Sequence, residues 1–286
     1  MVRPVSIALN VTQPFDWPAL IKFFSARVIP GVDQVAESIY SRTFAMTHNR
    51  GTVSLSRVSA GKVLATVQCR GVLDEASLRD RLNRLVNARA PTKRITAHLH
   101  GDATLARSLT KGPGLRVPGV WDPFELGVRA ILGQQVSVAG ATTLAGRIAL
   151  KFGTKINTQA AALTHLFPTP EVLSDADLNG LGLTTRRAAT ITGFARAVST
   201  TPALLDATKP LEGFVDELVK LNGFGPWTAH YMAMRMGYSD AFPASDLGVR
   251  KALNMAPEKE VQKRAESWRP YRATAAMHLW ASLSAE

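Results

Sequence analysis

A short turn near the end of the chain constrains the fold more than any other segment. Residues 222–225 read Asn-Gly-Phe-Gly, and glycine accepts backbone conformations that a side chain forbids. Pro226 follows, and it fits the first position of a new helix, where its missing N–H is not needed. Residues 216–253 therefore predict a helix, a tight hairpin, a second helix, a loop and a third helix.

The start of the second helix is also a predicted anion site. A helix that begins beside a glycine turn presents unpaired backbone N–H groups, which attract a phosphate. The amides that follow Gly223 and Gly225 can serve in this way, with the Thr228 hydroxyl as a further donor. Such contacts carry no base-sequence information, so they suit a protein that binds DNA at any position. The turn residues alone leave a plainer alternative open, namely a turn that only joins two helices.

The charge of the chain indicates a polyanionic partner. Its 286 residues carry a net charge of +12, with a pI of about 10.3. Nucleic acid is the first expected partner and an anionic membrane the second, although a generally basic, solvated surface would give the same balance. The N-terminus lacks a basic region followed by an apolar one, and no apolar run is long enough to cross a membrane. We therefore expect a cytoplasmic protein without a membrane anchor.

The single cysteine, Cys69, excludes several kinds of site. One thiol cannot form an intramolecular disulfide, a cysteine-only metal site or a four-cysteine iron–sulfur cluster. Cys69 ends a strand-like run, so we expect it to be a small residue of the core.

The first part of the chain, residues 1–112, predicts an α+β domain. Its segments alternate between strand-like and helical patterns, which is typical of an antiparallel sheet covered by helices. The predicted strands are residues 5–11, 41–47, 52–56 and 63–69, joined in part by hairpins at 48–51 and 59–62, and the predicted helices are residues 17–26 and 73–86. Residues 92–118 are transitional, and the glycine- and proline-containing segment 111–114 marks the expected domain join.

The second part, residues 113–286, predicts an all-α region of roughly eight helices with short connections. The predicted helices include residues 123–132, 136–152, 157–166, 174–178, 185–199 and 270–280, besides those around the hairpin. Gly133 marks the expected break between the first two.

These motifs together resemble a known family. The run LNGFGPWTA, followed by a proline-containing loop and Asp246, resembles the helix-hairpin-helix, Gly/Pro-rich loop and Asp signature of the DNA base-excision glycosylases. The most similar branch is that of DNA-3-methyladenine glycosylase II (AlkA), and the resemblance extends from Phe15 to Trp280. It implies a monomeric bacterial enzyme, associated with the nucleoid, that extrudes alkylated bases such as 3-methyladenine and 7-methylguanine from double-stranded DNA and excises them.

The resemblance implies a reaction site around Asp246. An ionised carboxylate there would stabilise the positively charged sugar formed as the N-glycosidic bond breaks, or orient the attacking water. Asp is also a preferred helix N-cap, and the two interpretations are compatible. The implied walls of the base pocket are aromatic, which suits a cationic alkylated base: Trp227, Tyr231, Trp280 and Phe23. The alternative is that Trp227 and Tyr231 form a stripe of core residues with Met234 at helical spacing.

Two neighbouring glutamines occupy the family's DNA-wedge positions. Gln134 matches the family, whereas relatives carry Leu at the position of Gln135. Gln135 can fill the gap left by the extruded base, but both glutamines are also ordinary loop residues. A second departure is Leu247, where relatives carry an aromatic residue, so we expect one aliphatic pocket wall.

The hairpin carries two further implications. In the family it binds a monovalent cation, Na⁺ or K⁺, through backbone carbonyls, which would be those of Val219, Leu221 and Phe224; no other cofactor is expected. Bifunctional relatives place a lysine where this chain has Trp227, and Lys220 precedes the turn. Without an amine there is no Schiff base with the sugar, so we expect a monofunctional enzyme without lyase activity.

Two rival functions remain. A non-catalytic helix-hairpin-helix DNA-binding module needs the glycines and the positive charge, but not Asp246 or the aromatic set. A glycosylase for oxidised or mismatched bases is disfavoured by the missing lysine and the missing cysteines.

Overall fold

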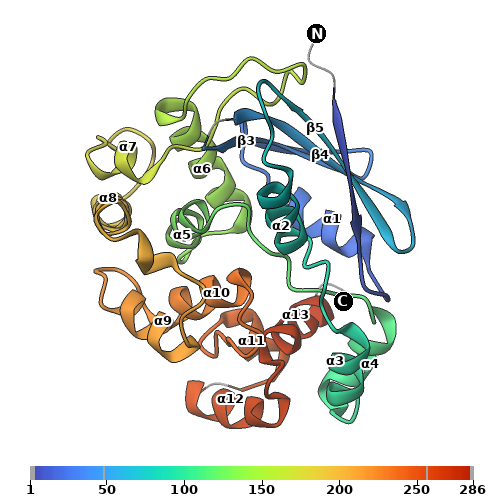
Figure 1. The fold of residues 1–286 in the computed structure, drawn as a ribbon. Helices are drawn as coiled ribbons and strands as arrows, with labels where there is room; N and C mark the ends of the chain where they lie inside the picture. The colour runs from blue at the N-terminus through green and yellow to red at the C-terminus, as the bar shows by residue number, and fades with distance from the viewer. Residues whose placement is uncertain (1–3, 48, 256, 284–286) are drawn as a thin grey trace.

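The computed structural model describes residues 4–47, 49–255 and 257–283, and it contains one antiparallel sheet and a larger helical region (Figure 1). The five strands lie in the order β1-β5-β4-β3-β2, every neighbouring pair antiparallel. Their bounds are Val5–Asn10 (β1), Asp33–Ala36 (β2), Ile39–Met46 (β3), Asn49–Ser59 (β4) and Lys62–Cys69 (β5). The predicted fold class, an α+β part followed by an all-α part, is confirmed.

Helices α1 (Trp17–Ser25) and α2 (Glu75–Leu85) cover the sheet, as predicted. The first helix begins where the Asp16 carboxylate accepts a hydrogen bond from the amide of Ala19 at 2.9 Å. Alternate strand residues and the apolar helix faces form one core, which includes Ile7, Leu55 and Leu82. Cys69 packs against this core from its half-buried position, consistent with the prediction.

The hairpin predictions were partly right. Ser59 pairs with Lys62, so the β4–β5 turn lies where the sequence predicted it. The earlier turn lies two residues closer to the N-terminus than predicted, because Met46 pairs with Asn49 and strand β4 already begins there. His48, part of that prediction, lies outside the described residues.

Eleven α-helices, α3 to α13, follow α2 within the described ranges. The bounds are Thr92–Leu99 (α3), Ala103–Lys111 (α4), Pro123–Leu132 (α5), Val138–Phe152 (α6), Pro170–Ser174 (α7), Thr185–Thr200 (α8), Leu211–Val219 (α9), Pro226–Met236 (α10), Leu247–Ala252 (α11), Glu258–Ala265 (α12) and Arg272–Leu283 (α13). Short 3₁₀ turns occupy Pro202–Leu205 and Glu266–Trp268. Helix α13 starts two residues after the predicted Pro270.

The helix predicted at residues 157–166 was wrong. This segment is irregular, with a turn at residues 161–162, and His165 pairs with Lys155 while Leu163 pairs with Gly31 in isolated bridges. The amides of Thr164 and His165 both donate to the Gly31 carbonyl, so contacts with a distant loop replace the local helical pattern. The helix predicted at 174–178 was also misplaced: α7 ends at Ser174, because Thr169 caps a start at Pro170.

Helices α3 and α4 lie before the predicted domain join at residue 112, yet their apolar faces belong to the helical core. Leu99, Leu105 and Leu109 pack there, and α4 contacts α13. The two cores meet at a buried ion pair, in which Arg42 of β3 lies 2.7 Å from Glu125 of α5. No helix within the described residues is long and apolar enough to span a membrane.

Candidate active site

The hairpin between α9 and α10 forms as predicted. Its two glycines occupy their positions for different structural reasons. Gly223 has φ of +84°, and a Cβ atom there would lie 2.3 Å from the Thr190 hydroxyl, so both conformation and space require glycine. Gly225 has an ordinary φ of −92° and open space around its Cα. It is the N-cap of α10, and since it has no side chain, no cap bond satisfies the first N–H groups of the helix.

The predicted wedge residue Gln134 is tied to this hairpin. Its side-chain amide donates to the Gly223 carbonyl and to the Thr228 hydroxyl, both at 3.0 Å. Thr228 is only 2% exposed, which does not favour the predicted phosphate contact of its hydroxyl. The amide of Gln134 therefore fixes the loop between α5 and α6 against the hairpin.

Gln135, the second predicted wedge residue, lies at the exposed tip of the same loop. Its φ of +55° is a left-handed conformation that residues other than glycine adopt rarely. Such conformations cluster at functional sites, where the surrounding structure maintains them. Of the two glutamines, only Gln135 is therefore placed to enter a DNA duplex without first breaking bonds to the hairpin.

Asp246 accepts three hydrogen bonds. Its Oδ1 accepts from the amide of Val249 at 2.9 Å, which caps α11, and from the indole N–H of Trp280 at 2.8 Å. Its Oδ2 accepts from the indole N–H of Trp227 at 2.9 Å. The carboxylate is thus both the helix cap and a lining group of a cavity, so its role as a cap is compatible with a place in a reaction site.

The cavity beside Asp246 has a volume of about 260 Å³ and one aromatic side. Trp227 and Tyr231 are stacked, with ring centroids 5.4 Å apart and planes 7° apart, and Tyr231 lies 6.4 Å from Trp280. Met234, on the same helix, is 1% exposed and belongs to the core. The structure therefore separates the predicted stripe, with the two α10 aromatic rings on the cavity and the methionine in the core.

Phe23 and Leu247 lie outside this set of lining residues. The ring of Phe23 lies between Arg27 and Arg235, whose guanidinium carbons are 3.8 and 4.6 Å from its centroid, and it lines a neighbouring, smaller cavity. Leu247 is 78% exposed, so the expected aliphatic wall is not made by this residue. That wall comes instead from residues of α5, α6 and the loop between them, which are Leu126, Ala130, Val136, Val138 and Ala141.

Two arginines of the cavity wall were not predicted as site residues. Arg27 follows α1, and Arg129 lies in the last turn of α5; both line the cavity with Asp246. Burial alone would raise the pKa of Tyr231, but Arg235, Arg27 and Arg129 together lower the pKa of this phenol below its usual value. Arg129 lies in the segment that resembles the family, but no sequence pattern marked either arginine as a site residue.

Gly248 is a further residue that the sequence did not single out. A Cβ atom on it would lie 3.0 Å from the Trp280 ring and 3.1 Å from the Asp246 carboxylate. Glycine at this position therefore leaves room for the indole to reach the carboxylate.

The predicted cation site lies at the C-terminal end of α9. Carbonyls at a helix C-terminus lack helical partners and carry partial negative charge, which suits a monovalent cation. The Leu221 carbonyl already accepts from the Phe224 amide at 3.0 Å, and each carbonyl oxygen has a second lone pair. Across the described ranges, no group of three or more His, Cys, Asp or Glu side chains is placed to hold a metal.

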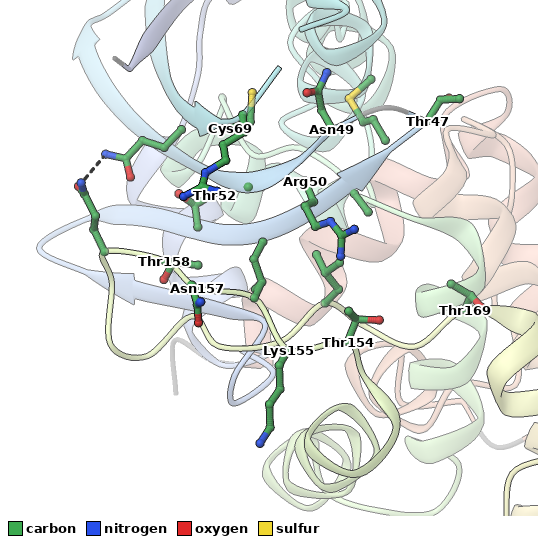
Figure 2. Close-up of a pocket in the computed structure, with 18 residues that line it drawn as sticks. Thr47, Asn49, Arg50, Thr52, Cys69, Thr154, Lys155, Asn157, Thr158 and Thr169 are labelled. Atoms are coloured by element: carbon green, nitrogen blue, oxygen red, sulfur yellow. Dashed lines mark hydrogen bonds between the residues drawn. The ribbon is translucent and has the colours of Figure 1, made fainter. Parts of the chain in front are cut away.

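A larger cavity lies elsewhere, between the sheet and the segment after α6 (Figure 2). Its volume is about 970 Å³, and it shares no lining residue with the Asp246 cavity. Its walls include the basic residues Arg50, Arg70 and Lys155 beside several polar and apolar side chains, and no carboxylate lines it among the residues described. Burial raises the pKa of the Cys69 thiol on its wall, so that thiol is a poor nucleophile.

Comparison with known proteins agrees with this geometry. Residues 6–122 match the model of the AlkA N-terminal domain, and residues 128–270 match that of the HhH-GPD superfamily base excision DNA repair proteins. A "probable bifunctional transcriptional activator/DNA repair enzyme AlkA" of Mycobacterium tuberculosis is 35% identical over 98% of this chain, which spans 57% of that relative's length. "DNA-3-methyladenine glycosylase 2" of Escherichia coli is 32% identical over 95% of both chains.

Solved structures with the same fold include DNA glycosylases. A 3-methyladenine DNA-glycosylase from Archaeoglobus fulgidus superposes with a TM-score of 0.83 at 23% identity, covering 96% of this chain and 97% of the other. An 8-oxoguanine glycosylase/lyase from Clostridium acetobutylicum, in complex with double-stranded DNA, gives 0.77 at 18% identity over 100% and 98%. Together with the two matched models and the Escherichia coli relative, the hairpin and Asp246 identify this chain as a member of the HhH-GPD superfamily of base excision DNA repair proteins, in the branch that carries an AlkA N-terminal domain.

Proposed function

We propose that this protein is a monofunctional DNA glycosylase that extrudes alkylated bases from duplex DNA, hydrolyses the N-glycosidic bond and leaves an abasic site. 3-Methyladenine and 7-methylguanine are the expected principal substrates. The observation that carries the proposal is the Asp246 carboxylate at the edge of a cavity walled by Trp227, Tyr231 and Trp280. A DNA-binding module would need neither the carboxylate nor the cavity.

The chemistry follows from the position of the carboxylate. Departure of the base leaves positive charge on the sugar, and a fixed anion stabilises that charge more in the transition state than in the bound substrate. Three donors hold Asp246 in one orientation, so little reorganisation is needed when the charge develops. The same carboxylate is suited to orienting the attacking water.

The remaining steps use the hairpin and the aromatic wall. The unpaired amides at the start of α10 bind a DNA phosphate, and Gln135 fills the space that the extruded base leaves. The stacked rings of Trp227 and Tyr231 attract a base that alkylation has made cationic. We expect the protein to act as a monomer in the bacterial cytoplasm, at the nucleoid, with Na⁺ or K⁺ at the carbonyls of the hairpin.

Release of free 3-methyladenine from methylated duplex DNA tests the proposal directly. Wild-type protein should release the base, and Asp246→Asn should lose this activity while it still binds DNA. Asn retains an oxygen for the Val249 amide, so the cap survives, but its NH₂ group faces the indole N–H of Trp227. Wild-type protein that binds DNA without releasing a base would instead support the non-catalytic alternative.

Borohydride tests the monofunctional part. The family's lysine position is Trp227, and the nearby Lys220 is exposed at the end of α9. Among the described residues that line the cavity, none carries an amine. Borohydride should therefore trap no covalent adduct, and strand cleavage should require added base or heat. An adduct on a denaturing gel would overturn this part alone.

A further inference from the structure

Hydrogen-bond acceptors and donors lie at opposite ends of the Asp246 cavity. At one end of the stacked pair, the indole N–H of Trp227 is bound to the Asp246 carboxylate. At the other end, the Tyr231 hydroxyl accepts a hydrogen bond from Arg235 at 3.0 Å. The aromatic wall therefore lies between a negative group and a positive group, and the sugar-directed carboxylate marks only the first of them.

Arg27 is the group at the positive end with spare capacity. Its guanidinium lies over the Phe23 ring, 3.8 Å from the ring centroid, and donates one hydrogen bond, to the Phe23 carbonyl at 3.3 Å. Within the described ranges it has no carboxylate partner, although a guanidinium has five N–H donors. An arginine on a cavity wall that has no carboxylate partner and still has free N–H donors is suited to donating to a ligand.

The other groups at this end hold Arg27 in place or add a donor. Arg129 donates to the Arg27 carbonyl and lies 3.7 Å from Glu125, which is itself fixed by the buried ion pair with Arg42. Since the Tyr231 oxygen accepts from Arg235, its own proton is available to a further acceptor. The whole end is thus a preformed set of donors, anchored to the sheet through Arg42.

We propose that Arg27, with Arg129 and the Tyr231 hydroxyl, forms a subsite that recognises an exocyclic oxygen of the extruded base. This inference rests on the proposed glycosylase function. An oxygen accepts from such donors, whereas an exocyclic amino group brings only more N–H donors to them and leaves both sides unpaired. The subsite therefore selects purines that carry oxygen at C6, among both alkylated and deaminated bases.

Two bases provide a matched comparison, because alkylation gives both a positive charge. 7-Methylguanine has an oxygen at C6, and 3-methyladenine has an amino group at the same position. The aromatic wall attracts both cations, so a difference between them reports on the edge of the base and not on its charge. Duplex DNA treated with dimethyl sulfate contains both, and their release is measured in one reaction by chromatography.

Arg27→Met removes the donors and keeps an apolar side chain over the Phe23 ring. The ratio of 7-methylguanine to 3-methyladenine released should fall about tenfold relative to wild type, a change of about 1.4 kcal/mol in transition-state stabilisation. Lys22→Met is the matched control, since it removes one positive charge from an exposed position on α1. The control should leave the ratio unchanged.

Tyr231→Phe provides a second, independent test that keeps the aromatic wall. Loss of its hydroxyl should lower the same ratio in the same direction, and this variant decides the question if Arg27→Met does not fold by far-UV circular dichroism. A ratio within about twofold of wild type in a folded variant would overturn the subsite. A wild-type protein that releases neither base refutes the proposed function instead, so the two failures are distinct.

Discussion

At the scale of single residues, the tryptophans around Asp246 combine two functions. Their rings form walls of the cavity, and their indole N–H groups hold both oxygens of the carboxylate. A substitution of either ring therefore changes the surface offered to the base and the orientation of the reacting group together. The two effects can be separated, because phenylalanine keeps a ring and removes the donor.

We expect Trp280→Phe and Trp280→Ala to differ in their substrate dependence. Trp280→Phe removes the 2.8 Å bond to Asp246 Oδ1, so it should slow release of cationic 3-methyladenine and of neutral hypoxanthine by a similar factor, about tenfold. Trp280→Ala also removes the stacking surface, and its further loss should be larger for the cationic base. Single-turnover release of the two bases measures both effects.

Folding is the control for this pair. Far-UV circular dichroism of both variants must match wild type, since Trp280 also packs against the helical core. If folded Trp280→Ala releases both bases at wild-type relative rates, the aromatic wall has no role in recognising charge.

The family resemblance implied Asp246, Trp227 and Tyr231 as site residues, and local signals in the chain agree with where the structure places them. A cap precedes its helix, and residues four apart share a helix face. The directions of Arg27 and Arg129 depend on contacts between α1 and α5, more than 100 positions apart, and no local pattern encodes them. For the same reason the sequence did not show that Gln134 binds back to the hairpin.

At the scale of elements, the hairpin depends on one of its glycines more than on the other. Gly223→Ala would place a methyl group against Thr190 and force alanine into a left-handed conformation, which costs about 1–2 kcal/mol before any clash. We expect a Tm lower by about 4 °C or more, together with weaker DNA binding. Thermal unfolding and a binding titration on undamaged duplex measure the two effects.

Gly225→Ala is the comparison within the same turn. Its φ is accessible to alanine and no atom lies within 4 Å of the added methyl group, so its loss of Tm should be clearly smaller. Equal losses at the two positions would mean that the left-handed conformation is not what the turn requires.

Elements with strong internal patterns were predicted well, and elements fixed by distant contacts were not. Strands β1 and β5 and helices α1 and α8 follow clear alternation or helical spacing with a cap. The four-residue edge strand β2 is too short to show a period. Residues 157–166 have helix-like apolar spacing, but their backbone amides bond to Gly31 instead.

At the scale of the whole molecule, the base cavity depends on both cores. Arg27 comes from the chain segment after α1, whereas the aromatic wall comes from α10 and α13. The cores are locked together beside it by Arg42 with Glu125, and by Arg235, which donates to the carbonyl of Gly119 at 2.8 Å. The N-terminal part is therefore a structural component of the reaction site.

Acid should weaken this assembly partly through His278 on α13. Burial lowers the pKa of His278 from its ordinary 6.5 to about 4, and its ring is hydrogen-bonded to Ser108 of α4 at 2.9 Å. The unfolded chain takes up this proton below pH 6.5, whereas the folded chain does so only near pH 4. The contribution of neutral His278 to the free energy of unfolding is thus complete above pH 6.5. It decreases as the pH falls toward 4, by about 3 kcal/mol in all.

His278→Gln tests this dependence, because an amide does not titrate in this range. Its Tm at neutral pH can differ from wild type, but its decrease between pH 7 and 4.5 should be shallower. Parallel decreases in the two proteins would assign the acid sensitivity to other groups.

The net charge of +12 predicts a strong dependence of DNA binding on salt. If about five phosphates are neutralised, the logarithm of the association constant should fall with that of the salt concentration at a slope of roughly −4 to −5.

Arg186 is exposed in the first turn of α8. Its neighbour Arg187 donates to the Gln134 carbonyl at 2.6 Å, so Arg186 lies beside the loop that carries Gln134 and Gln135. Arg186→Gln should therefore reduce the slope by about one. Arg57→Gln, at an exposed position on strand β4, removes the same charge and should leave the slope unchanged. Equal effects of the two variants would mean that DNA contacts the protein without a preferred face.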